Sequence, residues 1–448
     1  MLLLSALLLA LKLGVIDRFP NPLRQPGFDG QAVAQARTPL RADLTGGLGL
    51  FGYDLADRIV AGDGGLDVAL YLAAREPIPR ALKPAFFITD AAGRLWDDTN
   101  VLLPPRWHRE PPPTFEWAPG QYAQWAYRLE VLPGTPPGEY ELWMSVFDKA
   151  TFETLSVLDE QGNAVAPRLA LGTLTVARPA RPFRLQPENA TPHRFGPVSL
   201  LGYGLDRTSV RAGEALALTW YWRAEAAPTH DLTARVEMLD GAGRAVAGWD
   251  LEPVNGYGAA QWQPGDAWRG QQRLVIPAEL AGGAYQLAVS VAGEAGRQTL
   301  GPLQVEAPQR TFTPPPFQAA SGVEFAGVGA LAGYSLDRAG RELTVALVWK
   351  ALATPPLGYK VFVHLDGGGR VWAQSDAAPA GGARPTTGWL AGEYVSDAHT
   401  LALPVDLPAG DYALWVGLYD PLSGARVAAA GPEAGADGRV RLVTLSLP

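Results

Sequence analysis

The chain repeats one set of three short motifs three times, always in the same order. A Gly-Tyr-x-Leu tetrapeptide, soon followed by Asp-Arg, comes first, a Trp-x-x-Gly turn comes second, and a Gly-x-Tyr tripeptide comes third. These motifs begin at Gly52, Trp117 and Gly138, then at Gly202, Trp262 and Gly283, then at Gly333, Trp389 and Gly410. Ordered markers of this kind are the signature of a tandem array. The 448 residues exceed a single core, so three copies of one unit are expected.

Proline-rich segments separate the repeats. ARPARPFRLQPENATP (177–192) and APQRTFTPPPF (307–317) are expected to be extended, semi-rigid spacers. The chain is thereby divided into a membrane-helix remnant or anchor (1–17), a proline-rich linker (18–40) and three β-sandwiches. The sandwiches span 41–178, 195–307 and 322–448, and the linkers 179–194 and 308–321 separate them.

Apolar residues within each repeat alternate with a period of two, as in LDVALYL (66–72), LALTWYW (216–222) and LTVALVW (343–349). This period indicates half-buried strands. Glycine (51 residues) and proline (40 residues) make up about a fifth of the chain, which suits many turns and opposes long helices. The sequence predicts an all-β fold of three tandem immunoglobulin-like antiparallel β-sandwiches after a short N-terminal apolar helix.

The aromatic residues of the repeated motifs are predicted to be structural. A tyrosine that opens a late strand can bury its ring and return its hydroxyl to nearby backbone, as in the tyrosine corner of immunoglobulin-like domains. Tyr140, Tyr285 and Tyr412 are expected to be buried in this way. Trp117, Trp262 and Trp389 are expected to cover an edge of each core rather than to bind a ligand.

An Asp-x-x-Gly-Arg stretch lies between two strand patterns in every repeat, and we interpret it as a hairpin turn. The aspartates can bond the turn backbone and the glycines can adopt a positive φ. A calcium loop would need several alternating carboxylates and a closing glutamate, which these stretches lack. The residues concerned are Asp90, Asp240 and Asp366, with Gly93, Gly243 and Gly369.

His364 is the most suggestive histidine, because it precedes the third of these turns. Alignment on the Asp-x-x-Gly-Arg stretch places it opposite Ile88 and Met238, on an apolar face. It is therefore predicted to be a partly buried, satisfied imidazole rather than a base or a metal ligand.

Composition excludes several classes of chemistry. The chain has no cysteine, so thiolate catalysis, thiolate metal sites and disulfides are ruled out. Its formal charge of −8 is spread without blocks, which argues against nucleic-acid binding. The histidines show no metal spacing, and no nucleophile motif occurs. No catalytic residue, metal or cofactor is therefore predicted, and the chain is not expected to be an enzyme.

Residues 2–16, LLLSALLLALKLGVI, are apolar apart from Ser5 and Lys12. The stretch is shorter than the roughly 20 residues that a spanning helix needs. No basic residue precedes it and no cleavage site follows closely, which disfavours a signal peptide. An uncleaved anchor or the end of a membrane helix is the favoured interpretation, and a buried core helix is the alternative. Flanking basic residues alone would favour a cytoplasmic exit.

Several runs carry a family resemblance. The stretch from Tyr359 to Glu393, with KVFVHLD and RPTTGWLAGE, and the stretch LPVDLPAGDYALWVGLYDPLSGAR (403–426) resemble sandwich domains C-terminal to the multipass region of large bacterial membrane proteins. Many of those, especially from Chloroflexi-type bacteria, are labelled dolichyl-phosphate-mannose-type glycosyltransferases. The run LLGYGLDRTSVRAGEALALTWYWRA (200–224) is similar to the opening of the same module. The resemblance covers roughly residues 41–448, implies that 1–17 ends a membrane helix, and carries over no catalytic residue.

Two functions follow as hypotheses. The first is a non-catalytic extracytoplasmic array at the bacterial cell envelope that binds glycan or protein or acts as a spacer. The second is an accessory C-terminal region of a membrane glycosyltransferase, which positions a lipid-linked sugar donor or an acceptor. The favoured binding face is the proline-rich insertion RWHREPPPTFEW, because exposed aromatic rings can stack on sugars. The candidate residues in or beside this insertion are Trp107, Phe115 and Trp125.

Overall fold

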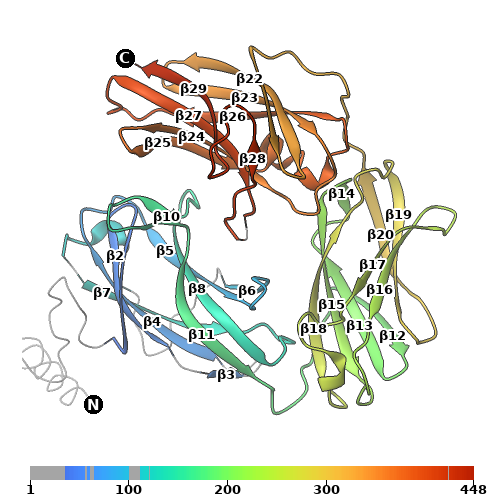
Figure 1. The fold of residues 1–448 in the computed structure, drawn as a ribbon. Helices are drawn as coiled ribbons and strands as arrows, with labels where there is room; N and C mark the ends of the chain where they lie inside the picture. The colour runs from blue at the N-terminus through green and yellow to red at the C-terminus, as the bar shows by residue number, and fades with distance from the viewer. Residues whose placement is uncertain are drawn as a thin grey trace, which may run out of the picture. The chain divides into compact units, whose positions relative to one another are not determined.

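The structure is a computed structural model that describes residues 36–55, 58–60, 65–99, 111–120, 122–421 and 423–447. Over these residues the secondary structure consists of β-strands and short 3₁₀ turns, so the all-β prediction is confirmed. The strands form six sheets that come in three β-sandwich-like pairs, in sequence order (Figure 1). The apolar stretch 2–16 lies outside the described residues. Among the described residues no helix is long and apolar enough to cross a membrane.

The first sheet pair has the strand orders β10-β9-β1-β2-β4-β7 and β3-β11-β8-β5-β6. All its strand contacts are antiparallel except that of the short β3 with β11. The strands are Thr38–Leu44 (β1), Leu48–Leu55 (β2), Arg58–Val60 (β3), Gly65–Ala74 (β4), Leu82–Thr89 (β5), Leu95–Thr99 (β6), Tyr122–Glu130 (β7), Gly138–Asp148 (β8), Val157–Leu158 (β9), Ala164–Ala166 (β10) and Leu169–Ala177 (β11).

The second sheet pair has the orders β12-β13-β15-β18 and β14-β20-β19-β16-β17. Here too one short strand, β14, runs parallel to its neighbour β20. The strands are Asn189–Phe195 (β12), Val198–Leu205 (β13), Ser209–Arg211 (β14), Ala215–Ala224 (β15), Ala234–Leu239 (β16), Ala245–Leu251 (β17), Ala267–Val275 (β18), Gly283–Val291 (β19) and Gln298–Glu306 (β20).

The third sheet pair has the orders β26-β23-β22-β21-β28 and β25-β24-β27-β29. Buried residues of both sheets form one core, to which β23 contributes Leu343, Val345, Leu347 and Trp349. The strands are Ala319–Phe325 (β21), Gly329–Ala339 (β22), Glu342–Ala351 (β23), Lys360–Gly367 (β24), Arg370–Ala377 (β25), Tyr394–Ala402 (β26), Gly410–Tyr419 (β27), Ala429–Ala430 (β28) and Val440–Leu447 (β29).

The chain groups into two compact units. One extends to Leu185 and includes Asp266–Arg269, and the other holds Gln186–Gly265 and Gly270–Pro448. The second unit therefore contains most of the second sheet pair and all of the third.

The repeated Gly-Tyr motif marks the same β-bulge in each sheet pair. The register shifts at Gly52, Gly202 and Gly333, each at its pairing with the following long strand. A side chain has no room at these positions. A Cβ on Gly202 would lie 2.3 Å from the carbonyl oxygen of Asn189, and one on Gly333 would lie 2.4 Å from the Phe317 ring. Glycine is required because another strand or linker packs directly against the bulge.

The tryptophan of each Trp-x-x-Gly motif follows a 3₁₀ turn and closes it. The turns are Thr114–Glu116 (η2), Ala259–Gln261 (η3) and Thr386–Gly388 (η5). Each indole Nε1 donates to the carbonyl five residues earlier, and each ring is at most 4% exposed. The bonds join Trp117 to Pro112, Trp262 to Tyr257 and Trp389 to Arg384.

The tyrosine of each Gly-x-Tyr motif donates its hydroxyl to the carbonyl four residues earlier, joining Tyr140 to Pro136, Tyr285 to Ala281 and Tyr412 to Pro408. Tyr140 and Tyr412 are 4% exposed, and burial raises the pKa of Tyr140. Both rings pack edge-on against a tryptophan of the neighbouring hairpin, Trp96 or Trp372. Tyr285 is only half-buried, because Val246 occupies that hairpin position in the second pair.

The Asp-x-x-Gly-Arg stretches form hairpin turns of two kinds. Asp90 accepts hydrogen bonds from the amides of Ala92 and Arg94, and Asp240 does the same two and four residues on. The third turn is different. Gly368 and Gly369, both with positive φ, form a two-residue turn between Gly367 and Arg370. Asp366 stands in strand β24, and its Oδ2 accepts from Arg439 at 3.0 Å.

The shorter third turn corrects the alignment of His364. Ile88 and Met238 pair with Leu142 and Leu287, each two residues after the motif tyrosine, and the residue that pairs with Leu414 is Leu365. Leu365 is therefore the counterpart in the core. His364 lies one residue away and faces outward, half-buried, 5.0 Å from the Phe362 ring. A one-residue slip exchanges the two faces of a strand, so the alignment of His364 with Ile88 and Met238 was wrong, although the imidazole is partly buried as expected.

Candidate functional site

One position differs in character between the sheet pairs and lies on an outermost strand, two strands away from the tyrosine of the Gly-Tyr motif. Tyr53 pairs with Leu70, which pairs with Trp125 of β7. Tyr334 pairs with Leu347, which pairs with Asp397 of β26. Trp125 and Asp397 are therefore structural counterparts, as are Tyr127 and His399 two residues on. We call this the edge site of each sheet pair.

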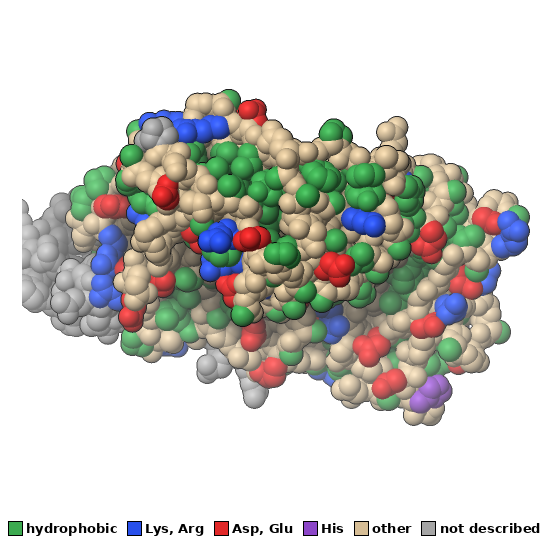
Figure 2. All heavy atoms as spheres, turned by 45° about the horizontal axis from the view of Figure 1, so that its top comes forward, with side chains coloured by type: hydrophobic (Ala, Val, Ile, Leu, Met, Phe, Trp, Pro, Cys, Tyr) green, Lys and Arg blue, Asp and Glu red, His purple; other side chains and the backbone are tan. Residues whose placement is uncertain are grey.

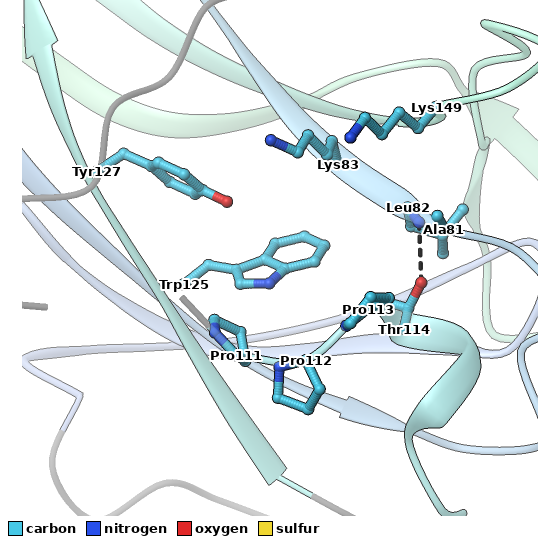
Figure 3. Close-up of a pocket in the computed structure, with 10 residues that line it drawn as sticks. All are labelled: Ala81, Leu82, Lys83, Pro111, Pro112, Pro113, Thr114, Trp125, Tyr127 and Lys149. Atoms are coloured by element: carbon cyan, nitrogen blue, oxygen red, sulfur yellow. Dashed lines mark hydrogen bonds between the residues drawn. The ribbon is translucent and has the colours of Figure 1, made fainter. Parts of the chain in front are cut away.

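The edge site of the first sheet pair holds a cavity of about 210 Å³. Trp125 and Tyr127 come from β7, the start of β5 contributes one wall, and the segment before η2 contributes another. Figure 3 shows the Lys83 and Lys149 side chains on one side of the Trp125 ring and Pro111 and Pro112 on the other. The lining residues are Ala81, Leu82, Lys83, Pro111, Pro112, Pro113, Thr114, Trp125, Tyr127 and Lys149.

A buried threonine fixes the walls of this cavity. Thr114, 1% exposed, accepts a hydrogen bond from the Leu82 amide at 2.8 Å and donates to the Arg80 carbonyl at 2.5 Å. The same arrangement holds Thr386 between the Tyr359 amide and the Leu357 carbonyl. Leu82 and Tyr359 are thus counterparts, and so are the next residues, Lys83 and Lys360.

The cavity combines aromatic rings with positive charge. Trp125 packs against Trp117 with ring centroids 5.7 Å apart, and Tyr127 packs edge-on against Phe86 at 6.3 Å. Two of the ten lining residues are lysines and none is acidic. Elsewhere, on the face that Figure 2 shows, acidic and basic side chains are interspersed. The cavity can therefore hold a ring-sized group that carries a negative charge.

Of the three residues predicted for binding, the two that the structure describes, Phe115 and Trp125, do not form one stacking surface. Trp107 lies outside the described residues. Phe115 is 54% exposed on η2, whereas Trp125 is 5% exposed and lines the cavity from below the surface. Lys83, Lys149 and Tyr127 were not singled out from the sequence. No sequence pattern marked them as site residues, because they approach Trp125 only when separate segments of the chain pack together.

The edge site of the third sheet pair is filled by a polar network. Ser375 Oγ lies 2.9 Å from His399 Nδ1, and His399 Nε2 lies 3.1 Å from Asp397 Oδ2. Asp397 also accepts from the Trp349 indole at 3.1 Å and from the Ala380 amide at 2.8 Å. Ala380 belongs to the short turn Pro379–Gly382 (η4). The one sequence signal for this network is Asp397-x-His399, which places both side chains on one face of a strand.

The serine, histidine and aspartate of this network are arranged differently from a serine-hydrolase triad. The ring nitrogens are exchanged relative to a serine-hydrolase triad, since Nδ1 faces the serine. Asp397 and His399 are each 2% exposed, and the Asp397 carboxylate lies within hydrogen-bond distance of three partners. The network instead joins β25, β26 and η4, as buried polar groups must find partners.

The second sheet pair fills its edge site in a third way. Gln272, the counterpart of His399, donates to the Glu252 carbonyl at 2.7 Å and contacts Asn255. The counterpart of Asp397 is Gly270, where a Cβ would lie 2.0 Å from the Pro253 carbonyl oxygen. A backbone segment thus occupies the space that the first sheet pair leaves as a cavity.

Comparisons with known proteins do not extend these findings. No family model matches the chain, and no curated protein matches it. Among the described residues, no group of three or more histidine, aspartate or glutamate side chains is placed to hold a metal ion.

Proposed function

We propose that the chain is a non-catalytic array of three immunoglobulin-like β-sandwiches on the outer side of a bacterial cell envelope. Its first member binds a glycan through the edge site. The observation that carries this proposal is the cavity in which Trp125 and Tyr127 stand beside Lys83 and Lys149. The apolar run 2–16 and the resemblance to modules of bacterial membrane proteins support the location, with the apolar run as the anchor.

The size and chemistry of the cavity favour one sugar unit with a carboxylate. A volume of about 210 Å³ is below the roughly 300–1,000 Å³ of pockets for drug-sized ligands, so a single ring is the largest group that fits. Aromatic side chains offer an apolar surface to the C–H face of a sugar. Lysine ammonium groups form charge-assisted hydrogen bonds to a carboxylate.

Isothermal titration of the full chain with oligosaccharides tests the proposal. Oligogalacturonate is the acidic probe, and the neutral galactose oligomer of equal length is its partner. We expect binding of the acidic probe, and a loss of at least about tenfold in affinity for Lys83→Met or Lys149→Met, because each removes a charge-assisted bond but keeps an apolar stem.

Lys360→Met is the matched control, because Lys360 occupies the counterpart of Lys83 in a sheet pair whose edge site is filled. It should leave the affinity unchanged. If the acidic probe binds equally well to the Lys83→Met/Lys149→Met double variant, or does not bind the wild-type chain, the cavity is not the glycan site.

A further inference from the structure

The residue directly after the Trp-x-x-Gly turn is acidic in the second and third repeats, Asp266 and Glu393. Each is buried or nearly so, and each binds an arginine of the linker that leads into its own sheet pair. Arg178 follows directly on β11, and Arg310 lies in the segment between β20 and β21. We call Arg178–Asp266 and Arg310–Glu393 the linker ion pairs.

Glu393 is fully buried, and its carboxylate is shared by two arginines. Arg310 binds Oε2 at 2.5 Å and Arg384 binds Oε1. The Leu390 amide adds a hydrogen bond to Oε2 at 3.1 Å. Both arginines are less than one-fifth exposed, so little water competes for the charges. A buried carboxylate is retained only where such partners surround it.

Arg310 binds more than the acid. Its guanidinium also donates to the Gly388 carbonyl at 3.0 Å, in η5, and to the Ala278 carbonyl at 2.5 Å. Ala278 follows β18 and therefore belongs to the second sheet pair. One side chain of the linker thus bonds the sheet pair that precedes it and the turn of the sheet pair that follows.

A second contact lies beside this one. Thr387 Oγ1, buried in η5, donates at 2.5 Å to the carbonyl of Gly213, two residues after the end of β14. Gly213 has φ +89°, and a Cβ placed on it would lie 2.0 Å from the Gly388 Cα. The backbones meet there without room for a side chain on Gly213, so the arrangement depends on glycine at that position.

The first linker has an ion pair at the corresponding place. Arg178 binds the Asp266 carboxylate, and its guanidinium lies 5.6 Å from the centre of the Trp268 ring. Asp266 is 9% exposed. Residues Asp266–Arg269 group with the compact unit that contains Arg178 rather than with the rest of their own sheet pair.

We propose that the acid after the Trp-x-x-Gly turn is a repeated docking point for an arginine of the preceding linker, and that the pair holds the linker against the sheet pair it leads into. Proline already stiffens these linkers. The ion pair adds a fixed attachment, so that the linker does not swing freely. The first repeat carries Gln121 at this position, which has the shape of glutamate without its charge. No linker ion pair is therefore expected in front of the first sheet pair.

Limited trypsin digestion of the full chain tests the inference, because Arg310 is itself a cleavage site before Thr311. In the wild type, Arg310 is engaged and cleavage there is slow. Glu393→Gln, which copies the residue of the first repeat, should raise the rate of cleavage after Arg310 at least about tenfold, since breaking a buried pair frees its partner. Mass spectrometry of the fragments gives the rate for each site.

Lys350 lies within strand β23 and reports unfolding of the third sheet pair itself. Its cleavage should stay unchanged in Glu393→Gln, and the exposed Glu324→Gln should alter neither site. Asp266→Asn should raise cleavage after the exposed Arg184 in the first linker and leave Arg310 protected. Equal increases at Arg310 and Lys350 would show that Glu393 only supports the fold. No increase at Arg310, or none at Arg184, would overturn the docking role.

Discussion

The first and third sheet pairs have the same framework, but the edge site of the first is a cavity and that of the third is filled. The motif tryptophan, the threonine before it and the motif tyrosine make the same bonds in both. At one counterpart position, however, the first pair has Trp125 beside a cavity, and the third has Asp397 within a buried network. Two alternate residues of one outer strand therefore decide whether this site is hollow or filled, while the framework stays constant.

The strongest expected effect comes from removing the centre of the filled site. Asp397→Ala leaves the Trp349 indole, the Ala380 amide and His399 without their shared acceptor. Removing one charged member of a buried network lowers the free energy of unfolding by about 3–5 kcal/mol, because its partners stay buried without an acceptor. Hydrogen exchange of the β23 amides measures this as a loss in the free energy of opening.

Asp406→Ala, in an exposed turn of the same sheet pair, is the control and should cost little. A cost below about 1 kcal/mol for Asp397→Ala would mean that the network does not hold the third edge site closed, and the contrast with the first would lose its physical basis.

A smaller effect is expected at the outer end of the same network. Ser375→Ala removes one hydrogen bond from His399 at a half-buried position, which costs about 0.5–1.5 kcal/mol. The wild-type chain should not hydrolyse nitrophenyl esters, because His399 and Asp397 are sealed from solvent. Reproducible ester hydrolysis that Ser375→Ala abolishes would instead make this site catalytic.

The smallest expected effect is a pH dependence of amide exchange that distinguishes the hairpin turn of the first sheet pair from that of the third. Burial by itself raises the pKa of Asp90, but hydrogen bonds from Trp96 and Arg94 outweigh it and hold that pKa below its ordinary value of 3.8. A depressed folded-state pKa stabilises the hairpin above the unfolded value, and this contribution is lost as the pH falls through the folded value. Protection of the Ala92 amide should therefore weaken below pH 3.8.

Asp90→Asn should remove that pH dependence, since the amide side chain does not titrate in this range. Asp366→Asn should leave exchange at the third turn unchanged, because Gly368 and Gly369 form that turn without the carboxylate. A pH response of the third turn that follows Asp366 would contradict the distinction between the two hairpins.

The all-β fold was predictable because its determinants are local. Alternation with a period of two needs only neighbouring residues. The third hairpin shows where local reasoning fails. Its Asp-x-x-Gly-Arg sequence matches the other two hairpins, yet its three consecutive glycines allow a shorter turn. The shorter turn places His364 on the outer face of the strand. The choice between turns is made by strand pairing, which the motif does not encode.

The edge sites could be predicted only in part. Trp125 lies beside the segment that the sequence favoured, but its burial depends on Trp117 and the prolines that pack over it. Ser375, His399 and Asp397 come from outer strands of two different sheets. Only the packing of those sheets brings the serine to the histidine, so spacing along the chain carried no signal beyond Asp397-x-His399.

The closed 3₁₀ turn before each motif tryptophan has a consequence for the order of folding. Its indole bond spans five residues and the tyrosine hydroxyl bond spans four, so both close small loops at little entropic cost. Sandwich strands, by contrast, pair over long separations and assemble slowly. Adjacent repeats with similar strands risk exchanging them during synthesis. We therefore expect early local closure within each repeat to favour pairing among its own strands over exchange with the next repeat.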